Sequence, residues 1–468
     1  MQKKALLINP PTGIYAREDR CQNSASEQAL NILRPPISLM YIASNLEKKN
    51  VKCKIVDYPV ERKNWGDFKK DLNSFNPDFF IINTSTTTID NDIKACKIAK
   101  KIRSSIVTIA RGTYFSANNN DITTLKKFKY LDIIIRGETE FIMNEILEKK
   151  LENIKGITFR KENKIIKTKK RKPIIVERLP LPARHLIKNE LYSRIDTDEP
   201  MAIIETARGC PYKCIYCLGP KVYGTRVRKR SVESIIKEIS VCVNKFQINN
   251  FHFKSETFTI NKEWVKKLCL EILKKKMNIK WACNSRVDTL NEKTILLMKQ
   301  SGCWGVSFGV ESGNQETLNK IKKGTTLKQV EKTISLCRKY EIKAYTFFII
   351  GFPWENKKMI NDTIKFSKKI KSDFAEFYFP HPFEGTELEM IVKEYGLYEE
   401  SIKNKNPEMK PSFRTKYLSK KELIKLRNKA VISFYFRPSY IFRTLTKLKS
   451  FKELRNYIKE GLKILVRT

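Results

Sequence analysis

Three cysteines lie close together in the middle of this 468-residue chain, at Cys210, Cys214 and Cys217. Thiolates are the ligands that iron–sulfur clusters prefer, and a cluster of four irons normally takes four of them. Three thiolates at this spacing can therefore hold three corners of a four-iron, four-sulfur cluster and leave its fourth iron open to solvent or a substrate. A zinc site with a distant fourth ligand is the alternative, although no second cysteine pair or histidine pair follows at zinc-finger spacing.

The middle segment around these cysteines alternates short apolar runs with amphipathic helical stretches. Six strands that alternate with helices predict a parallel sheet with right-handed crossovers, which places its site at the carboxyl ends of the strands. We therefore expect a partial TIM-type (β/α)6 barrel. The predicted strands are residues 202–205, 250–253, 279–283, 305–310, 344–350 and 375–379, and the predicted helices are residues 232–245, 262–275, 291–300, 327–340 and 359–371.

The N-terminal part predicts a separate α/β domain of the doubly wound, Rossmann-like kind. Ligands of such a sheet bind beyond the carboxyl ends of its strands. The predicted strands are residues 4–9, 52–56, 79–83, 106–110 and 131–135, and the predicted helices are residues 37–49 and 90–103.

The residues around the cysteines resemble a known family. The run Glu205-Thr-Ala-Arg-Gly209 leads into the first cysteine and the aromatic Tyr216 precedes the last, which is similar to the radical S-adenosylmethionine (SAM) superfamily. The resemblance implies that the three cysteines hold the cluster and that the amino and carboxylate groups of SAM chelate the open iron. It also implies that an external donor of the flavodoxin or ferredoxin type supplies one electron. SAM is then cleaved to methionine and a 5′-deoxyadenosyl radical, which abstracts hydrogen from an unactivated carbon.

The same resemblance assigns SAM contacts to residues that follow the predicted strands. Glu256 stands where the family has an acidic residue near the SAM amino group, but Ser255 replaces the first of the usual two acids. Taken singly, each assigned residue could also be an ordinary polar strand end. The further assignments are Asn284 and Arg286 after the third strand, Glu311 and Ser312 after the fourth, and Gly351 and Pro353 after the fifth, where the backbone would approach the adenine.

Three short sequence segments of the N-terminal part resemble the cobalamin-binding domain found upstream of many radical SAM enzymes. They are residues 7–11, 34–43 and 135–138. The resemblance implies cobalamin as a further cofactor. Family members often have Gly-Gly-Pro-His after the fourth strand, whereas this chain has Arg111-Gly-Thr-Tyr114, so no imidazole can ligate the cobalt from below. Two interpretations stay open. Either cobalamin binds with its lower face unligated or water-ligated, which would ease methyl transfer, or the domain has kept the fold and lost the cofactor.

A hydroxyl-rich run at the end of the third N-terminal strand is the candidate cobalamin contact. It offers Thr84, Ser85 and Thr86 on the side where ligands of such sheets bind. The same run could be a plain strand-to-helix loop in which Asp90 caps the following helix.

The composition and the segment boundaries complete the expected organisation. We predict a cobalamin-binding-like domain at 1–150, a linker with a hairpin at 151–194, the radical SAM barrel at 195–385 and a basic helical region at 386–468.

The net charge of +42 is consistent with binding nucleic acid or an anionic membrane, although lysine spread over exposed helices explains much of it. Aromatic and basic residues interleave at 434–443, so this region could lie on a membrane or pack on the barrel. We expect a cytoplasmic protein that could associate with a membrane, because no signal peptide is recognised and the eleven cysteines are scattered.

The sequence therefore predicts a radical SAM enzyme that forms a carbon–carbon bond, by cobalamin-dependent methylation or a related reaction, on a lipid-like or tetrapyrrole substrate. Non-methylating radical chemistry with a degenerate cobalamin domain is one alternative. A second is tRNA methylthiolation with another cluster on Cys21, Cys53 and Cys96, although no small RNA-binding β-barrel follows. A third is a non-catalytic basic module that binds nucleic acid and uses the cluster structurally.

Overall fold

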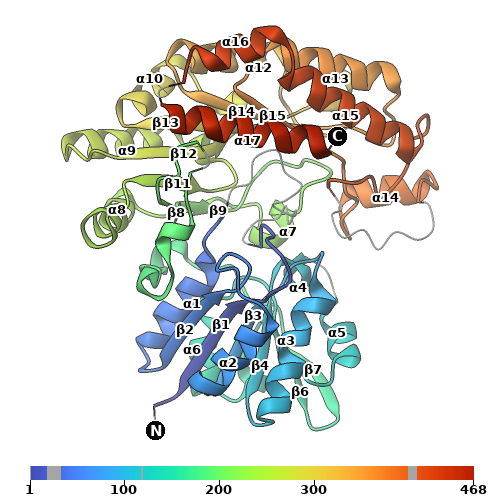
Figure 1. The fold of residues 1–468 in the computed structure, drawn as a ribbon. Helices are drawn as coiled ribbons and strands as arrows, with labels where there is room; N and C mark the ends of the chain where they lie inside the picture. The colour runs from blue at the N-terminus through green and yellow to red at the C-terminus, as the bar shows by residue number, and fades with distance from the viewer. Residues whose placement is uncertain are drawn as a thin grey trace. The chain divides into compact units, whose positions relative to one another are not determined.

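The computed structural model describes residues 2–17, 33–117, 120–194, 196–398, 408–448 and 450–467. These residues form two compact units (Figure 1), one built mainly from residues up to 192 and the other mainly from residues beyond it.

The first unit is an α/β sheet with the strand order β2-β1-β3-β4-β5-β6-β7 among the described residues. β1 to β5 run parallel, as the doubly wound pattern predicts, and an antiparallel hairpin of β6 and β7 extends the sheet beyond β5. The strands are β1 (Lys4–Asn9), β2 (Lys52–Asp57), β3 (Phe79–Asn83), β4 (Val107–Arg111), β5 (Ile133–Ile135), β6 (Ile157–Lys161) and β7 (Lys164–Lys167).

The hairpin that the sequence predicted is present as β6 and β7, but it belongs to the sheet of the first unit rather than to a linker at 151–194. Ile157 and Phe159 of β6 are buried in the core of the first unit, and β6 covers the edge that β5 would otherwise leave unpaired. Further along, the Tyr192 hydroxyl donates a hydrogen bond of 3.0 Å to Asp57 at the end of β2. The first unit therefore continues to about residue 192.

Helices cover both faces of this sheet because side chains alternate along each strand. Ala5 and Leu7 of β1 pack in the core under α1 (Ile37–Glu47) and α6 (Ile142–Glu148). Leu6 and Ile8 pack in the opposite core, under α2 (Trp65–Phe75), α3 (Ile89–Ile102) and α5 (Asp121–Lys127). The sequence did not predict α2, whose apolar pattern is interrupted by charged residues.

The second unit contains the predicted parallel sheet of six strands, in the order β15-β14-β13-β12-β11-β8. Each strand lies within two residues of its predicted bounds. The strands are β8 (Met201–Glu205), β11 (Asn250–Lys254), β12 (Lys280–Ser285), β13 (Cys303–Glu311), β14 (Lys343–Ile349) and β15 (Phe374–Tyr378), and the helices between them are α8 (Val232–Phe246), α9 (Lys262–Lys274), α10 (Glu292–Gln300), α11 (Gln315–Lys320), α12 (Leu327–Lys339) and α13 (Lys357–Lys369).

The two faces of the barrel strands differ in their access to solvent. In β14, Ala344 and Phe348 are buried against the outer helices, while the intervening Tyr345, Phe347 and Ile349 are partly exposed. The same alternation recurs in β13, where the partly exposed positions include Ser307 and Gly309. The inner face of the barrel is therefore accessible, and small side chains line part of it.

Three C-terminal helices, α15 (Lys420–Tyr435), α16 (Pro438–Leu445) and α17 (Phe451–Arg467), pack on the barrel unit (Figure 1). The Tyr440 hydroxyl donates to the Asp373 carbonyl at 2.8 Å, and the Tyr457 ring stacks on Phe374 with centroids 5.9 Å apart. Both partners lie at the start of β15, so α16 and α17 cover the end of the barrel opposite the strand carboxyl ends. None of the helices in the described part of the chain is long and apolar enough to cross a bilayer.

Candidate functional site

The three predicted cluster ligands lie on one loop after β8 and differ from the other cysteines in exposure. Cys210, Cys214 and Cys217 are partly exposed, whereas the seven other cysteines that the structure describes are buried. Partial burial raises the pKa of the Cys214 thiol and is the largest influence on that pKa. Three accessible thiols on one short loop can serve together as ligands.

The loop is anchored at its middle by Ile215. This side chain is buried in an apolar cluster with Leu318, Phe352 and Leu388. Its backbone N–H donates to the Ile321 carbonyl at 3.2 Å, and its carbonyl accepts from the Leu388 N–H at 3.1 Å. Ile215, one of the two residues between the second and third cysteines, is thus fixed on both sides, which holds the loop in place.

A carboxylate holds the beginning of the same loop. Glu256 follows β11, and its Oε2 accepts a hydrogen bond of 3.0 Å from the N–H of Gly209, the residue before Cys210. The predicted SAM-contacting acid therefore lies beside the cysteines.

The three thiols do not form a site for a single metal ion. Among the described residues, no group of three His, Cys, Asp or Glu side chains is arranged to hold one ion. A cluster needs no such convergence, because each iron takes its own thiolate.

A buried ion pair lies at the end of β13. Glu311 has a φ of +69°, and its carboxylate accepts a hydrogen bond of 2.7 Å from the Lys323 ammonium, with both side chains nearly inaccessible. A Cβ on Gly309 would come within 2.3 Å of the Glu311 carboxylate, so only glycine leaves room for this arrangement. Lys323 has no recognisable sequence signal and was not predicted.

Arg286 joins this pair to the cysteine loop. Its guanidinium forms two hydrogen bonds of 2.9 Å to Asp288, donates to the Lys323 carbonyl at 2.6 Å, and lies 3.6 Å from the centroid of the Tyr212 ring. Tyr212 is in the cysteine loop, between the first two cysteines. The structure thus brings Arg286 and Glu311 together beside the loop.

Other predicted residues have different surroundings. Asn284 is partly exposed on β12, beside Ser307 of β13. Ser312 is fully buried, and its hydroxyl bonds to Thr363 at 3.0 Å and accepts from the Asn314 N–H at 3.1 Å. The Ser312 hydroxyl therefore holds the turn after β13 together.

The turn after β14 contains the predicted Gly351 and Pro353. Gly351 has a φ of +96°, which glycine adopts without strain. Glu355 is inaccessible to solvent, and its carboxylate accepts from the N–H groups of Gly351 at 2.7 Å and Phe352 at 3.0 Å, and from the Thr317 hydroxyl at 3.3 Å. Glu355, which the sequence did not single out, therefore ties this turn to α11.

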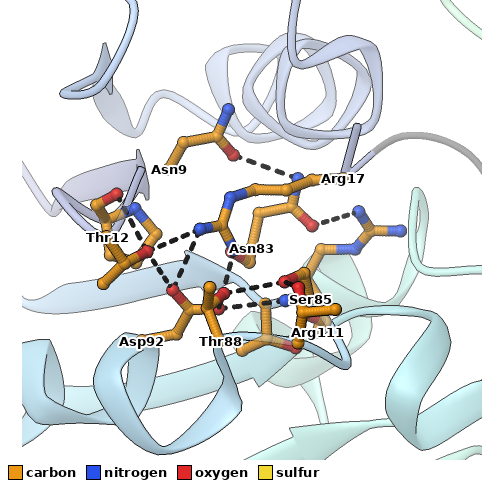
Figure 2. A network of polar contacts seen from close by, with 11 residues as sticks. Asn9, Thr12, Arg17, Asn83, Ser85, Thr88, Asp92 and Arg111 are labelled. Atoms are coloured by element: carbon orange, nitrogen blue, oxygen red, sulfur yellow. Dashed lines mark hydrogen bonds and ion pairs between the residues drawn. The ribbon is translucent and has the colours of Figure 1, made fainter. Parts of the chain in front are cut away.

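In the first unit, the hydroxyl-rich run after β3 belongs to a buried network (Figure 2). Asp92 of α3 accepts from the Arg17 guanidinium at 2.7 Å, the Thr88 hydroxyl at 2.7 Å and the Ser85 N–H at 3.0 Å. Thr84 donates to the Arg111 carbonyl at 2.9 Å. Asp92, rather than the predicted Asp90, therefore secures the start of the helix.

This network changes the interpretation of the hydroxyl run. Thr84 and Ser85 are fully buried, and both hydroxyls bond within the protein. Thr86 is partly exposed. The sequence placed all three at the correct strand end but could not show that two of them are turned inward.

A second row of polar contacts crosses the carboxyl ends of β2, β1, β3 and β4. Asn9 donates to Asp57 at 3.0 Å, Asn83 donates to Asn9 at 3.1 Å, and Arg111 donates to Asn83 at 2.7 Å (Figure 2 shows the last two). Burial raises the pKa of Asp57 to about 6. These contacts fix the strand ends where ligands of doubly wound sheets bind.

The cysteines proposed for a methylthiotransferase cluster do not form one. Cys53 is buried in β2 and Cys96 in α3, and burial raises the pKa of both thiols, that of Cys53 to about 12. Cys21 lies outside the described residues. Buried, protonated thiols are poor cluster ligands.

Comparison with known proteins agrees with this fold. A model of the Radical SAM superfamily matches residues 204–367. An uncharacterized methyltransferase of Pyrococcus horikoshii is 30% identical over 449 residues, covering 94% of each chain. The anaerobic magnesium-protoporphyrin IX monomethyl ester cyclase of Rubrivivax gelatinosus is 25% identical over 448 residues, covering 93% of this chain and 79% of the relative.

The solved structure of the cobalamin-dependent S-adenosylmethionine radical enzyme OxsB, with aqua-cobalamin and S-adenosylmethionine bound, has a similar fold. Its TM-score is 0.74 at 16% identity, covering 100% of this chain and 72% of OxsB. The barrel with its cysteine loop and the matches together define a radical enzyme of the methyltransferase-like class. The chain belongs to the radical SAM superfamily, which confirms the prediction from the sequence.

The buried Glu355 predicts a pH-dependent stability. Burial raises its pKa from 4.5 to about 7. The stability that this shift gives the folded protein is therefore fully present below pH 4.5 and is lost as the pH rises through 7. The loss amounts to about 3 kcal/mol. Glu355→Gln can keep the three contacts without ionising. The variant should therefore gain stability relative to wild type between pH 5 and pH 8.

Urea unfolding followed by tryptophan fluorescence measures this difference, because Trp264, Trp281, Trp304 and Trp354 all lie in the barrel unit. Glu316→Gln on the exposed side of α11 is the matched control and should show little change. A stability difference between Glu355→Gln and wild type that does not vary with pH would contradict this assignment of the buried carboxyl.

Proposed function

We propose that this radical SAM enzyme holds a four-iron cluster on Cys210, Cys214 and Cys217 and binds SAM at the open iron. The observation that carries the proposal is the group of three accessible thiols on a loop anchored at Ile215, while the other described cysteines are buried. When bound and reduced by a flavodoxin- or ferredoxin-type donor, the cluster and SAM supply a 5′-deoxyadenosyl radical that removes hydrogen from an unactivated carbon.

The residues around the loop have distinct proposed roles. Glu256, whose Oε2 accepts from the Gly209 N–H, is assigned to the SAM amino group by the family resemblance. Arg286, Glu311 and Lys323 form a cluster of charged side chains next to the loop. Their contacts with one another stabilise these buried charges before a substrate binds. The contacts of SAM with Glu311, Asn284 and the Gly351–Pro353 turn follow from the family resemblance, and Ser312 acts by shaping the turn.

The substrate is proposed to enter the accessible inner face of the barrel. Ser307 on β13 is small and partly exposed there, and Phe347 on β14 and Tyr378 on β15 offer partly exposed aromatic surface. A flat or apolar molecule fits such a lining. We therefore propose a tetrapyrrole or lipid-like substrate, and the name of the cyclase from Rubrivivax gelatinosus supports the tetrapyrrole class.

The first unit is proposed to bind cobalamin, which supplies the methyl group for transfer. The fixed ends of β1, β3 and β4 form a platform at the expected place, and Gly112 lies so close to Thr84 that a Cβ would clash. The chain has no histidine before residue 185, so the cobalt would have no imidazole below it. The similarly folded OxsB, whose structure was solved with aqua-cobalamin bound, supports the assignment.

A specific observation favours the alternative of non-methylating chemistry with a degenerate first unit. Two of the three hydroxyls assigned to cobalamin are buried and bonded within the protein. The first unit would then serve as a substrate platform, while the chemistry of the barrel would be unchanged.

We predict that Cys214→Ala abolishes the cluster and all SAM cleavage. Two thiolates cannot replace the three that the loop provides, so iron and sulfide should fall from about four of each per chain to a small residue. The measurement is iron and sulfide analysis after anaerobic purification, together with chromatography of 5′-deoxyadenosine. Cys242→Ala, which removes a buried core cysteine, is the matched control and should retain both. Cleavage that survives in Cys214→Ala would refute the cluster assignment.

We also predict that protein purified with cobalamin contains about one cobalt per chain. Cobalt analysis and the ultraviolet–visible spectrum measure this occupancy. The Glu256→Gln variant should keep the cobalt, because the substitution lies in the barrel unit. It should lose most SAM cleavage, because it removes the carboxylate charge proposed to meet the SAM amino group. Iron without cobalt in the wild type would rule out cobalamin-dependent methylation and support the platform alternative.

A further inference from the structure

The C-terminal helices carry a concentration of exposed apolar side chains. Of the eighteen large hydrophobic residues that are exposed in the described part of the chain, eight lie between positions 432 and 462. Phe442 is 72% exposed and Phe451 is 82% exposed. We define the C-terminal surface by the exposed members on the last two helices, which are Ile441, Phe442 and Leu445 of α16 and Phe451, Ile458 and Leu462 of α17.

The opposite sides of both helices are fixed on the barrel. On α16, the Arg443 guanidinium donates to the Lys371 carbonyl at 2.7 Å, and the Tyr440 hydroxyl donates to the Asp373 carbonyl. On α17, Tyr457 stacks on Phe374. Because both helices are held at residues 371–374, each presents its remaining apolar side chains outward in a set orientation.

Basic residues interleave with the apolar ones on α17. Phe451, Arg455, Ile458, Lys459 and Leu462 are all exposed, at positions i, i+4, i+7, i+8 and i+11 of the helix. This spacing places them along one side of an α-helix. One stripe therefore offers both apolar and cationic groups.

The sequence of the whole region carries the same sign of charge. Residues 432–467 contain nine Lys or Arg residues and two acidic ones, Glu453 and Glu460. The basic residues are Arg437, Arg443, Lys447, Lys449, Lys452, Arg455, Lys459, Lys463 and Arg467. Among the described side chains, Arg443 and Lys447 bond to the barrel, whereas Arg455 and Lys459 are exposed beside Phe451, Ile458 and Leu462. These two cations next to apolar side chains favour an anionic occupant that also accepts apolar groups.

We propose that the C-terminal surface binds the interface of an anionic lipid membrane. Its phenylalanine, leucine and isoleucine side chains would enter the acyl boundary while Arg455 and Lys459 meet lipid phosphates. A second copy of the chain would bring two equally basic surfaces together, which repels. Nucleic acid would satisfy the charges and could stack on Phe442 and Phe451, but it would leave the four aliphatic side chains Ile441, Leu445, Ile458 and Leu462 exposed, whereas a lipid interface buries all six.

The surface lies away from the chemistry of the barrel. The helices cover the start of β15, whereas the cysteine loop follows the carboxyl end of β8. Membrane binding thus anchors the enzyme without occupying the candidate site. The inference goes beyond the proposed function and does not rest on it.

The test is sedimentation of the full-length protein with vesicles of phosphatidylcholine alone or mixed with phosphatidylglycerol. We expect binding to the anionic vesicles and little binding to the neutral ones. The double variant Phe442→Asp/Phe451→Asp should bind at least about tenfold more weakly, because it removes two inserted rings and adds repelled charges. Arg455→Gln/Lys459→Gln should lose about fivefold per charge, and added salt should reduce the wild-type binding.

The control is Met390→Asp on α14 (Glu387–Glu394), because Met390 is 61% exposed and lies outside the C-terminal surface. It should bind like the wild type, and the circular dichroism of all variants should match. Absent binding to anionic vesicles, or binding unchanged in the phenylalanine variant, would overturn the proposal. Self-association of the vesicle-free protein that Phe442→Asp/Phe451→Asp abolishes would assign the surface to a second copy instead.

Discussion

The anchoring of the cysteine loop at Ile215 is the constraint on which the candidate site depends. Two backbone hydrogen bonds and an apolar pocket fix this residue, and the Glu256 carboxylate fixes Gly209 at the start of the loop. A loop held at two points keeps three thiols accessible in one place, although short loops of this kind would otherwise lose conformational order. The parallel strands of the barrel make this possible, because their carboxyl ends bring Glu256, Arg286 and Glu311 to the same side from three different strands.

Paired buried charges occur in both units. In the barrel, Lys323 neutralises Glu311 while Arg286 binds Asp288; in the first unit, Arg17 binds Asp92. An isolated buried charge would cost several kcal/mol, so these partners are required for the charged side chains to stay where a ligand could meet them. Pairing also orients the groups before any ligand arrives, which reduces the ordering that binding must impose. The radical SAM fold therefore supplies polar surfaces at the strand ends of both sheets.

Much of this arrangement could be predicted from the sequence, because buried parallel strands are continuous apolar runs and the cysteine spacing is specific. The six barrel strands and the five parallel N-terminal strands were found in this way. Helix α2 was missed because charged residues interrupt its apolar face, and its start depends on Asn64, which caps the N–H groups of Gly66 and Asp67. Side-chain direction could not be predicted either. Ser312, Thr84 and Ser85 stand at the expected strand ends, yet their hydroxyls bond inward, while Lys323 became recognisable only through its contact with Glu311.

The central claim is that the cysteine loop leaves one iron of its cluster open for SAM. Electron paramagnetic resonance of the anaerobically reduced protein, recorded with and without SAM, tests it most directly. We expect a signal typical of a reduced four-iron cluster whose shape and g values change when SAM is added, because SAM binds the iron that lacks a thiolate. A cluster signal that SAM leaves unchanged, or the absence of a four-iron signal, would contradict this claim.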